Sequence, residues 1–441
     1  QNLKHPEILG RPTANSITVH LIFSDSADVR VEFGTVSGIY SGNSAWQTAA
    51  PDTAVEIELT GLMTNTLYYY RVSYKIPGTT TITNRPEHSF HTQRSPGNSF
   101  TFTIQADPHL DGQSDTNVYI RCLQNQLDDH PDFMIDLGDF LMTDKLKNTS
   151  NQIPFDTIPY RCNLLRNYYD KISHSVPLYI VLGNHEGEND YYYNQTPPNN
   201  LCIWATQSRK TYYPNPYPNS FYSGNTAVEP YGIGNPENYY AWEWGDALFM
   251  VINPYWYTKA QQHAGWGWTL GSKQYTWFKN TIRNSTAKFK FIFAHHVLGT
   301  GRGGIDMLDQ GEWGGKNLQG VWEFDKKRPD WSLPIHQLMV KYKVSAFFQG
   351  HDHIFVRQDQ DGIVYQETPN PANPFYEDTV SWRGAYQTGD YLPASGHLRV
   401  TVTPQEAKVD YVRSWMTKDE STTRKQGDVA FSYTIKPNIA N

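Results

Sequence analysis

Short runs of alternating polar and apolar residues fill the first 95 positions of the chain. They are closed by Gly, Asn, Ser or Pro and read SITVHLIF, DVRVEFG, AVEIELTGL, LYYYRVSYKI and EHSFHTQR. A period of two turns one face of a strand toward a core and the other toward water. Residues 1–95 are therefore predicted to form an all-β sandwich.

One segment of this region, LTGLMTNTLYYYRV, resembles the tyrosine corner of fibronectin type III domains. The resemblance implies a fibronectin type III-like sandwich in which the Tyr68 hydroxyl bonds to the backbone at a corner of the sheet. The stretch QRSPGNS then reads as a linker.

After residue 96 the pattern changes to apolar runs that alternate with helical segments, which is typical of an α/β or layered domain. The runs are FTFTIQA, FMIDLGD, PLYIVLGN, ALFMVIN, FKFIFAHH and VSAFFQGHDH. The segment SDTNVYIRCLQNQLDDH predicts a helix with Ser and Asp as capping residues and with Ile120, Leu123 and Leu127 on one face. We expect residues 96–441 to form the second domain.

Residues 187–240 interrupt this alternation. They are dense in Tyr, Pro and Asn and read as a loop-like insertion. A long structureless insertion in a compact domain is usually functional, so we expect it to form part of a substrate wall. A surface insertion without a function is the alternative.

Composition and charge exclude some classes of function. The 441 residues carry a net charge of −7 without a basic stripe, which argues against a nucleic-acid footprint. No apolar run reaches the roughly 18–20 residues of a membrane span. Because the chain begins with Gln1 rather than Met, we expect that a leader was removed and that the protein is secreted or periplasmic. The oligomeric state is left open.

The cysteines are Cys122, Cys162 and Cys202, and none has the CxxC spacing of a thiolate metal site. Two interpretations stand side by side: one disulfide plus a free thiol, or three unpaired thiols in the core.

Side chains that can bind metal ions follow five of the predicted strands. The sequences ADPH, LGDF, LGNHE, FAHH and QGHDHIF supply Asp107, His109, Asp139, Asn184, His185, His295, His296, His351 and His353. Oxygen and imidazole ligands without thiolates suit Mn, Fe or Zn, and a carboxylate can bridge two such ions. Gly138, Gly183 and Gly350 directly precede ligands and allow a close backbone approach. We therefore expect a dinuclear metal centre.

As a set, these motifs resemble those of the calcineurin-like metallophosphoesterases: D-x-H, G-D, G-N-H-E, H-H and G-H-x-H in this order over residues 100–405. The resemblance implies a four-layer αββα sandwich and the hydrolysis of a small phosphate ester by a hydroxide held between two divalent or trivalent ions. It assigns Asp107, His109, Asp139 and His353 to one ion and Asp139, Asn184, His295 and His351 to the other. Asp139 is the bridge, and His185 is the general acid or transition-state stabiliser.

The order of a β-sandwich and then this domain also resembles the purple acid phosphatases. Two positions depart from that group, because His109 replaces a Gly and Met142 stands where the Tyr ligand would be. We therefore do not expect the visible colour of a Tyr–ferric site.

Three neighbouring residues have open roles. The family pattern favours His295 over His296 as the ligand. Asp352 is expected to point away from the metals and to bond to its own loop. Glu186 either supports His185 or is an exposed carboxylate.

Arg302, in a Gly-rich loop after the fourth motif, is a candidate for gripping a phosphate oxygen, with a solvated loop arginine as the alternative. Tyr191, Tyr192, Tyr193 and Trp313 are candidates for an aromatic wall, or else they pack the insertion against the core.

The favoured function is phosphodiester hydrolysis. Phosphomonoester and phosphotriester hydrolysis on the same site are the alternatives. A metal-dependent hydrolase of other esters and a non-catalytic binding or adhesion module are the rival classes.

Overall fold

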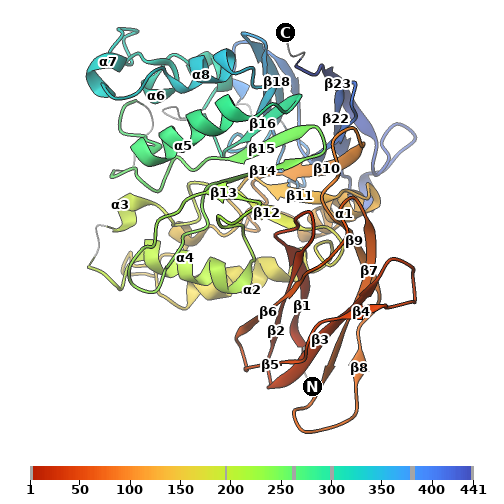
Figure 1. Cartoon of the computed structure of the whole chain (residues 1–441). Coiled ribbons are helices and arrows are strands. Elements are labelled where there is room, and N and C mark those ends of the chain that lie inside the picture. The colour runs from red at the N-terminus through yellow and green to blue at the C-terminus, as the bar shows by residue number, and fades with distance from the viewer. Residues whose placement is uncertain (1–2, 194–195, 261–264, 298–301, 378–382, 439–441) are drawn as a thin grey trace.

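The chain is described by a computed structural model that covers residues 3–193, 196–260, 265–297, 302–377 and 383–438. A small β-rich part at the N-terminus leans against a larger α/β part (Figure 1). Strand β9 ends at His91 and β10 begins at Phe100, so the connecting stretch coincides with the predicted linker.

The N-terminal part consists of antiparallel strands in two sheets, with the orders β1-β2-β6 and β4-β3-β7-β8. Their inner faces share an apolar core of their own. The predicted bond is present, since the Met63 N–H donates to the Tyr68 hydroxyl at 2.9 Å. The strands are β1 (Leu3–Gly10), β2 (Ile17–Phe23), β3 (Ala27–Gly34), β4 (Gly42–Asn43), β5 (Gln47–Ala49), β6 (Ala54–Leu59), β7 (Leu67–Lys75), β8 (Thr83–Asn84) and β9 (His88–His91).

Two further sheets form the centre of the larger part. The first has the order β12-β11-β10-β21-β22-β23, and the second β13-β14-β15-β16-β17-β19-β18-β20. The first sheet contains β10 (Phe100–Gln105), β11 (Phe133–Asp136), β12 (Leu178–Ile180), β21 (Gly396–Val402), β22 (Ala407–Arg413) and β23 (Val429–Ile435). The second contains β13 (Ser223–Gly224), β14 (Tyr240–Trp244), β15 (Ala247–Val251), β16 (Phe289–Phe293), β17 (Ala346–Gln349), β18 (Phe355–Gln360), β19 (Ile363–Glu367) and β20 (Asp390–Leu392).

The sheets pack face to face, with helices outside both, which gives the expected αββα layers (Figure 1). The core between the sheets is aromatic: the rings of Phe102 and Phe249 meet edge to face at 5.0 Å. Helices α1 and α2 cover the first sheet, and α5 and α8 cover the second. The helices are α1 (Thr116–Asp128), α2 (Thr157–Tyr169), α3 (Asp190–Tyr193), α4 (Leu201–Tyr212), α5 (Gly271–Asn284), α6 (Gly311–Gly314), α7 (Phe324–Lys327) and α8 (Ile335–Lys341), with 3₁₀ turns η1 (Thr143–Lys145), η2 (Gly304–Met307) and η3 (Thr417–Asp419).

Two sequence-based expectations need correction. Ile120 of α1 is exposed, because the helix turns Tyr119, Cys122 and Leu123 toward the sheet instead. The insertion at 187–240 is not loop-like throughout, since it contains α3, α4 and β13. The side chain of Asn200 caps α4 by accepting a hydrogen bond from the Ile203 N–H at 2.9 Å.

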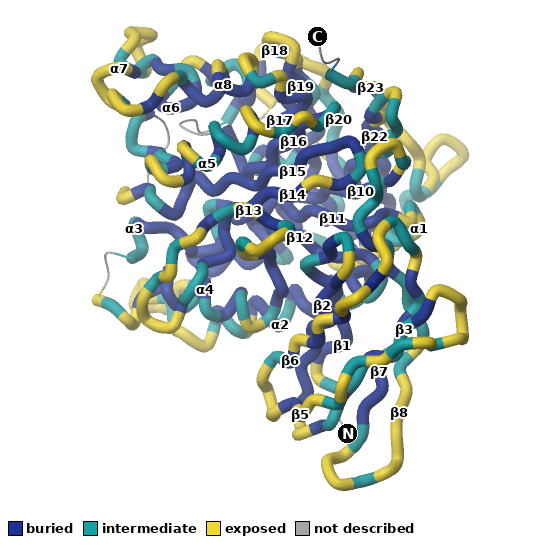
Figure 2. The backbone as a smooth tube through the Cα atoms, viewed as in Figure 1, coloured by how far each residue is buried: buried dark blue, intermediate teal, exposed yellow. Residues whose placement is uncertain are grey.

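The N-terminal part is joined to the larger part by a buried arginine. Arg166 of α2 is fully buried, and its guanidinium donates to the carbonyls of Pro6 at 2.7 Å and His20 at 3.0 Å. Buried polar groups on both sides are thereby satisfied. Figure 2 shows buried backbone continuing from β1 and β2 into the larger part.

The three cysteines are buried and unpaired, which agrees with the second of the two interpretations. Among the described residues, no helix combines the length and the apolar character that crossing a bilayer requires.

Candidate metal centre

The potential ligands follow the ends of strands that run in the same direction within each sheet. Strands β10, β11 and β12 are mutually parallel, as are β15, β16 and β17. The carboxyl ends of parallel strands meet at one edge, so the loops after them converge. Those loops carry Asp107, Asp139, Asn184, His295 and His351.

Two groups of ligand atoms result. In each, the atoms lie within 4.8 Å of one another; one group is Asp107, His109 and His353, and the other is Asp139, His295 and His351. The groups adjoin, because Nε2 of His295 lies 3.0 Å from Oδ2 of Asp139 and 3.8 Å from Oδ1 of Asp107. This arrangement provides two candidate metal sites side by side.

Several buried atoms in these groups and on neighbouring Asn184 fit metal binding because they lack hydrogen-bond partners within the described part of the chain. Asp107 Oδ1, His109 Nε2 and Asn184 Oδ1 are buried and have no hydrogen-bond partner among the described residues. A buried polar atom without a partner is costly, and a cation would satisfy each of them. Nδ1 of His295 is bonded to the carbonyl of Leu137 at 2.9 Å, so Nε2 is the atom that faces Asp139.

The backbone at the ligands is strained. Asp107, His109, Asp139, His351 and His353 all have left-handed φ angles, between 50° and 79°. Such angles cost side-chain-bearing residues free energy and concentrate at functional sites. The surrounding structure therefore holds these ligands in place at the expense of local backbone energy.

The buried carboxylates of the centre raise the pKa of the histidines beside them. Burial lowers the pKa of His295, but Asp139 and Asp107 outweigh it and raise that pKa to about 10. Burial also lowers the pKa of His109, but the interactions with Asp107 and Asp111 outweigh it and raise that pKa to about 9. The carboxylates thus create a field that favours cations at both groups.

Comparison with known proteins agrees with this geometry. The profile described as calcineurin-like phosphoesterase matches residues 100–355, more than half of the chain. The chain belongs to the calcineurin-like phosphoesterase family. It is accordingly a metal-dependent hydrolase of phosphate esters.

Solved structures show the same fold. A structure of PhoD aligns with a TM-score of 0.68 at 15% identity, over 99% of this chain and 91% of that chain. The purple acid phosphatase PPD1 from seeds of yellow lupin (Lupinus luteus) aligns with a TM-score of 0.62 at 16% identity, over 98% of this chain and 74% of that chain. No curated protein sequence matches the chain.

In this phosphoesterase, Glu186 holds the loop of Asp139. It is fully buried, which rules out an exposed carboxylate, and it accepts hydrogen bonds from the N–H groups of Asp139 and Phe140 at 2.9 Å and of Leu141 at 3.1 Å. Burial, followed by the charge of Asp139, raises the pKa of Glu186 to about 8. Glu186 thus supports a ligand loop rather than the side chain of His185.

Gly183, directly before Asn184, allows its loop to pack closely against the loop of Asp139. A Cβ on Gly183 would collide with Oδ1 and N of Asp139, so only glycine lets these two ligand loops meet. Gly138 has a φ of 101°, and a Cβ there would also collide with the backbone of Gly183.

His185 is held by a residue that the sequence did not reveal. Its Nδ1 lies 2.9 Å from Oδ1 of Asp144, and Oδ2 of Asp144 accepts a hydrogen bond from Tyr192 at 3.3 Å. Nε2 of His185 lies 3.9 Å from Oδ2 of Asp139. Asp144 lies five positions after Asp139 of the G-D motif, and it belongs to none of the five motifs.

The remaining histidine of the H-H pair lies outside both groups. His296 is buried against Trp268 and Tyr255, with ring centroids 5.0 and 5.4 Å away, and burial lowers its pKa to about 4. His295 is therefore the member of the pair that faces the carboxylates.

Arg302 is anchored beside the centre, and its side chain stays 30% exposed. Its Nη1 lies 2.6 Å from both the carbonyl of His351 and Oδ1 of Asp352. Asp352 points away from the ligands, as expected, and also accepts a hydrogen bond from Tyr386 at 2.6 Å. Residues 298–301 of the Gly-rich loop lie outside the described residues.

The expectation for Trp313 is wrong. Its ring is fully buried behind the second sheet, packs on Phe347 and donates to the hydroxyl of Tyr365 at 3.1 Å. It cannot contact a substrate.

The tyrosines of the insertion lie nearer the ligands. Tyr191 and Tyr192 pack together at 4.8 Å, and Asn189 donates to the hydroxyl of Tyr191 and to the carbonyl of Asn184. Contact of Tyr191 with a substrate stays a prediction.

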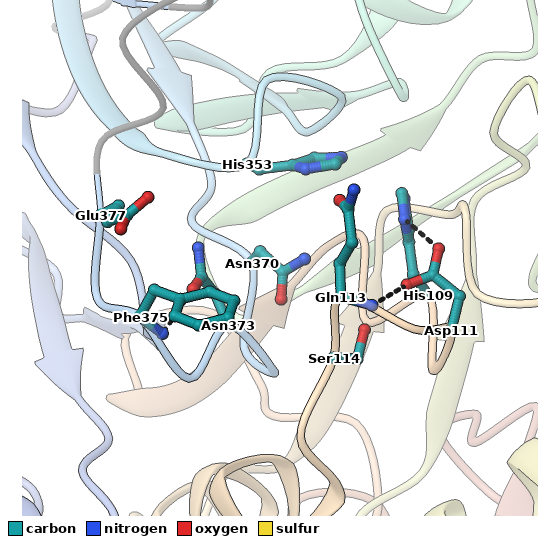
Figure 3. Close-up of a pocket in the computed structure, with 9 residues that line it drawn as sticks. All are labelled: His109, Asp111, Gln113, Ser114, His353, Asn370, Asn373, Phe375 and Glu377. Atoms are coloured by element: carbon teal, nitrogen blue, oxygen red, sulfur yellow. Dashed lines mark hydrogen bonds and ion pairs between the residues drawn. The ribbon is translucent and has the colours of Figure 1, made fainter.

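A pocket of about 270 Å³ opens beside the first ligand group (Figure 3). His109 and His353 form part of its lining, and the rest comes from two segments that sequence reasoning did not single out, residues 111–114 and 370–377. They are joined where the Asp115 N–H donates to the Ala372 carbonyl at 2.8 Å.

We predict that Glu186→Gln weakens metal binding roughly 10- to 100-fold, the usual effect of removing a group that orients a ligand. A glutamine offers one acceptor oxygen where the carboxylate offers two, so the N–H groups around Asp139 lose partners. Titration of metal-free protein with Mn²⁺ or Zn²⁺ in a calorimeter measures the change. Asp156→Asn, at an exposed position in the same part of the chain, is the control. Equal affinities for both variants would contradict the role given to Glu186.

Proposed function

We propose that the protein prefers phosphodiesters and cleaves them at the two adjoining ligand groups. The observation that carries the proposal is the position of His295, whose Nε2 lies within 3.8 Å of a carboxylate oxygen of each group. Ligand groups that adjoin in this way could hold two cations close enough to act on one phosphoryl group.

Asp107, His109 and His353 would hold one ion, and Asp139, Asn184, His295 and His351 the other, with Asp139 between them. The oxygen and nitrogen donors suit Mn, Fe or Zn. When bound, such ions stabilise the charge on phosphoryl oxygens and activate the attacking water.

His185 would supply the proton for the leaving oxygen. Its Nδ1 is fixed by Asp144, so the ring is oriented with Nε2 toward Asp139 and the centre. Burial lowers the pKa of His185, and the charges of Asp139 and Asp144 outweigh this and raise it. A protonated Nε2 next to the phosphoryl site is the arrangement that general acid catalysis requires.

The preference for a diester is supported by two pockets, one beside the first ligand group and one connected to His185 through Tyr192 and Asp144. The pocket of about 270 Å³ adjoins His109 and His353. A second one, of about 650 Å³, is lined by Tyr192 and by residues 147–154 of the loop before α2, and Tyr192 bonds to the Asp144 that holds His185. A diester has two substituents to place, whereas a monoester has one.

A panel of 4-nitrophenyl phosphate, an alkyl 4-nitrophenyl phosphodiester and a dialkyl triester tests the proposal on protein loaded with Mn, Fe or Zn. We expect the diester to have the highest kcat/KM. A monoester that exceeds it by tenfold or more would replace diesterase by phosphatase as the function, and the absence of any hydrolysis would overturn the proposal.

For His185→Gln we expect both metals to remain bound while kcat falls by roughly 10²–10⁴-fold with an alkoxide leaving group. The loss should be much smaller with 4-nitrophenolate, which leaves without a proton. Asp144→Asn should shift kcat in the same direction. Metal analysis and kcat for both leaving groups make the test, and loss of metal from His185→Gln would show that His185 is a ligand instead.

Arg302 would contact a phosphate oxygen from its anchor on Asp352. Removing a charged hydrogen bond costs about 1.5–3 kcal/mol, so Arg302→Ala should lower kcat/KM by roughly 10- to 150-fold. The loss should be largest for the doubly charged monoester and smallest for the neutral triester. Arg283→Ala, an exposed arginine of α5, is the matched control. Changes below about twofold for all three esters would remove Arg302 from substrate binding.

A further inference from the structure

The pocket beside His109 and His353 has two chemically different ends. Figure 3 shows the two imidazoles on one side, Glu377 and Phe375 on the opposite side, and Gln113 and Asn370 between them. One end is thus formed by the ligands of the first group, and the other by an acidic and an aromatic side chain. A molecule whose phosphate sits at the metals would extend a substituent along this pocket.

Away from the two imidazoles, the ionisable side chains of the lining are acidic. Apart from the two imidazoles, its ionisable residues are Asp111 and Glu377, and no lysine or arginine is among the described residues that line it. The carboxylate of Asp111 lies 3.5 Å from Nδ1 of His109, at the end of the pocket that the imidazoles form. Glu377 is exposed and forms no ion pair with a described basic residue. The far end therefore presents a carboxylate that no described cation of the chain neutralises.

The aromatic ring at the same end is unusually accessible. The side chain of Phe375 is 65% exposed, although most large apolar side chains of this chain are buried. The backbone that carries it is held in a turn, because Oδ1 of Asn373 accepts a hydrogen bond from the Phe375 N–H at 2.8 Å. An exposed aromatic face beside a carboxylate is a surface that attracts cations, and ammonium groups in particular.

We propose that this pocket binds an alcohol substituent of the substrate that carries an ammonium group, with Glu377 and Phe375 as the residues that select it. The proposal rests on the proposed function, since it places the phosphate at the metals. The amides of Gln113 and Asn370 then face the part of the substituent between phosphate and ammonium. A substituent with a second anionic group would meet Asp111 and Glu377 and be disfavoured.

The test uses substrates that differ in charge and not in shape. The 2-(trimethylammonio)ethyl and 3,3-dimethylbutyl diesters of 4-nitrophenyl phosphate are such a pair, because the second replaces the ammonium nitrogen by carbon. An exposed ion pair and a cation–π contact together correspond to a ratio of about tenfold in kcat/KM, mainly through KM. The 2-carboxyethyl diester should be hydrolysed less efficiently than either.

Variants of Glu377 and Phe375 test whether these residues cause the preference for the charged substrate. Glu377→Gln should reduce the charged-to-neutral ratio to roughly threefold, and Glu377→Gln combined with Phe375→Leu to about one. Glu58→Gln, an exposed carboxylate of β6 in the N-terminal part, should leave the ratio and the activity unchanged. A ratio near one in the unaltered enzyme, or a ratio that the variants do not change, would overturn the inference while diester hydrolysis itself still stood.

A binding measurement separates the two proposals. Calorimetry of metal-loaded protein with 2-(trimethylammonio)ethyl phosphate and with 3,3-dimethylbutyl phosphate gives the same ratio without turnover. If no ester is hydrolysed but the ammonium compound binds about tenfold more tightly, the pocket is confirmed and the proposed function fails. Equal dissociation constants would contradict the ammonium site whatever the activity.

Discussion

The burial of two carboxylates against one imidazole is the constraint on which the rest of this structure depends. Asp107 and Asp139 are both buried, and both approach Nε2 of His295. Negative charges in a protein interior are tolerated only where cations and hydrogen-bond donors compensate them. His295 and the N–H groups of His185 and His351, which donate to Asp139 at 2.8 Å and Asp107 at 2.7 Å, supply part of this compensation. Cations at the two candidate sites would supply the remainder, and they would also satisfy Asp107 Oδ1, His109 Nε2 and Asn184 Oδ1, which are buried without hydrogen-bond partners among the described residues.

A rigid frame is needed to keep that arrangement from relaxing. The left-handed backbone at five ligands would return to ordinary angles unless its neighbours prevented it. The packed aromatic core between the sheets fixes the ends of β10, β11, β16 and β17 relative to one another. Glu186 then locks the loop after β11 by accepting several of its N–H groups. Buried Asp136 adds to this, since its Oδ1 accepts a hydrogen bond from Gly138 at 2.9 Å and its Oδ2 one from Tyr169 at 2.7 Å.

The features that could be predicted from the sequence are those that a local pattern of residues encodes. The strands around the ligands are apolar on both faces and end in Gly, Asp, Asn or His, so their type and their order along the chain could be predicted. The strands β21, β22 and β23 were not recognised, although β21 pairs with β10 in the middle of the first sheet. Helix α4 was missed because Tyr, Pro and Asn flank it. Trp313 was misplaced because composition does not distinguish an aromatic ring in a wall from one in a core.

Residues that act through other residues were the hardest to find. Asp144 and Glu186 function by contacts across 41 to 47 positions of sequence, and no local pattern encodes such contacts. The same holds for the pocket lining, because residues 111–114 and 370–377 meet only after β10 and β19 have been placed in different sheets. The candidate ligands directly follow strand ends that the core holds fixed, whereas the proposed substituent pocket is lined by loops that can change without disturbing them. Substrate selection in this chain is therefore expected to depend on Asp111, Glu377 and Phe375 rather than on the insertion at 187–240 alone.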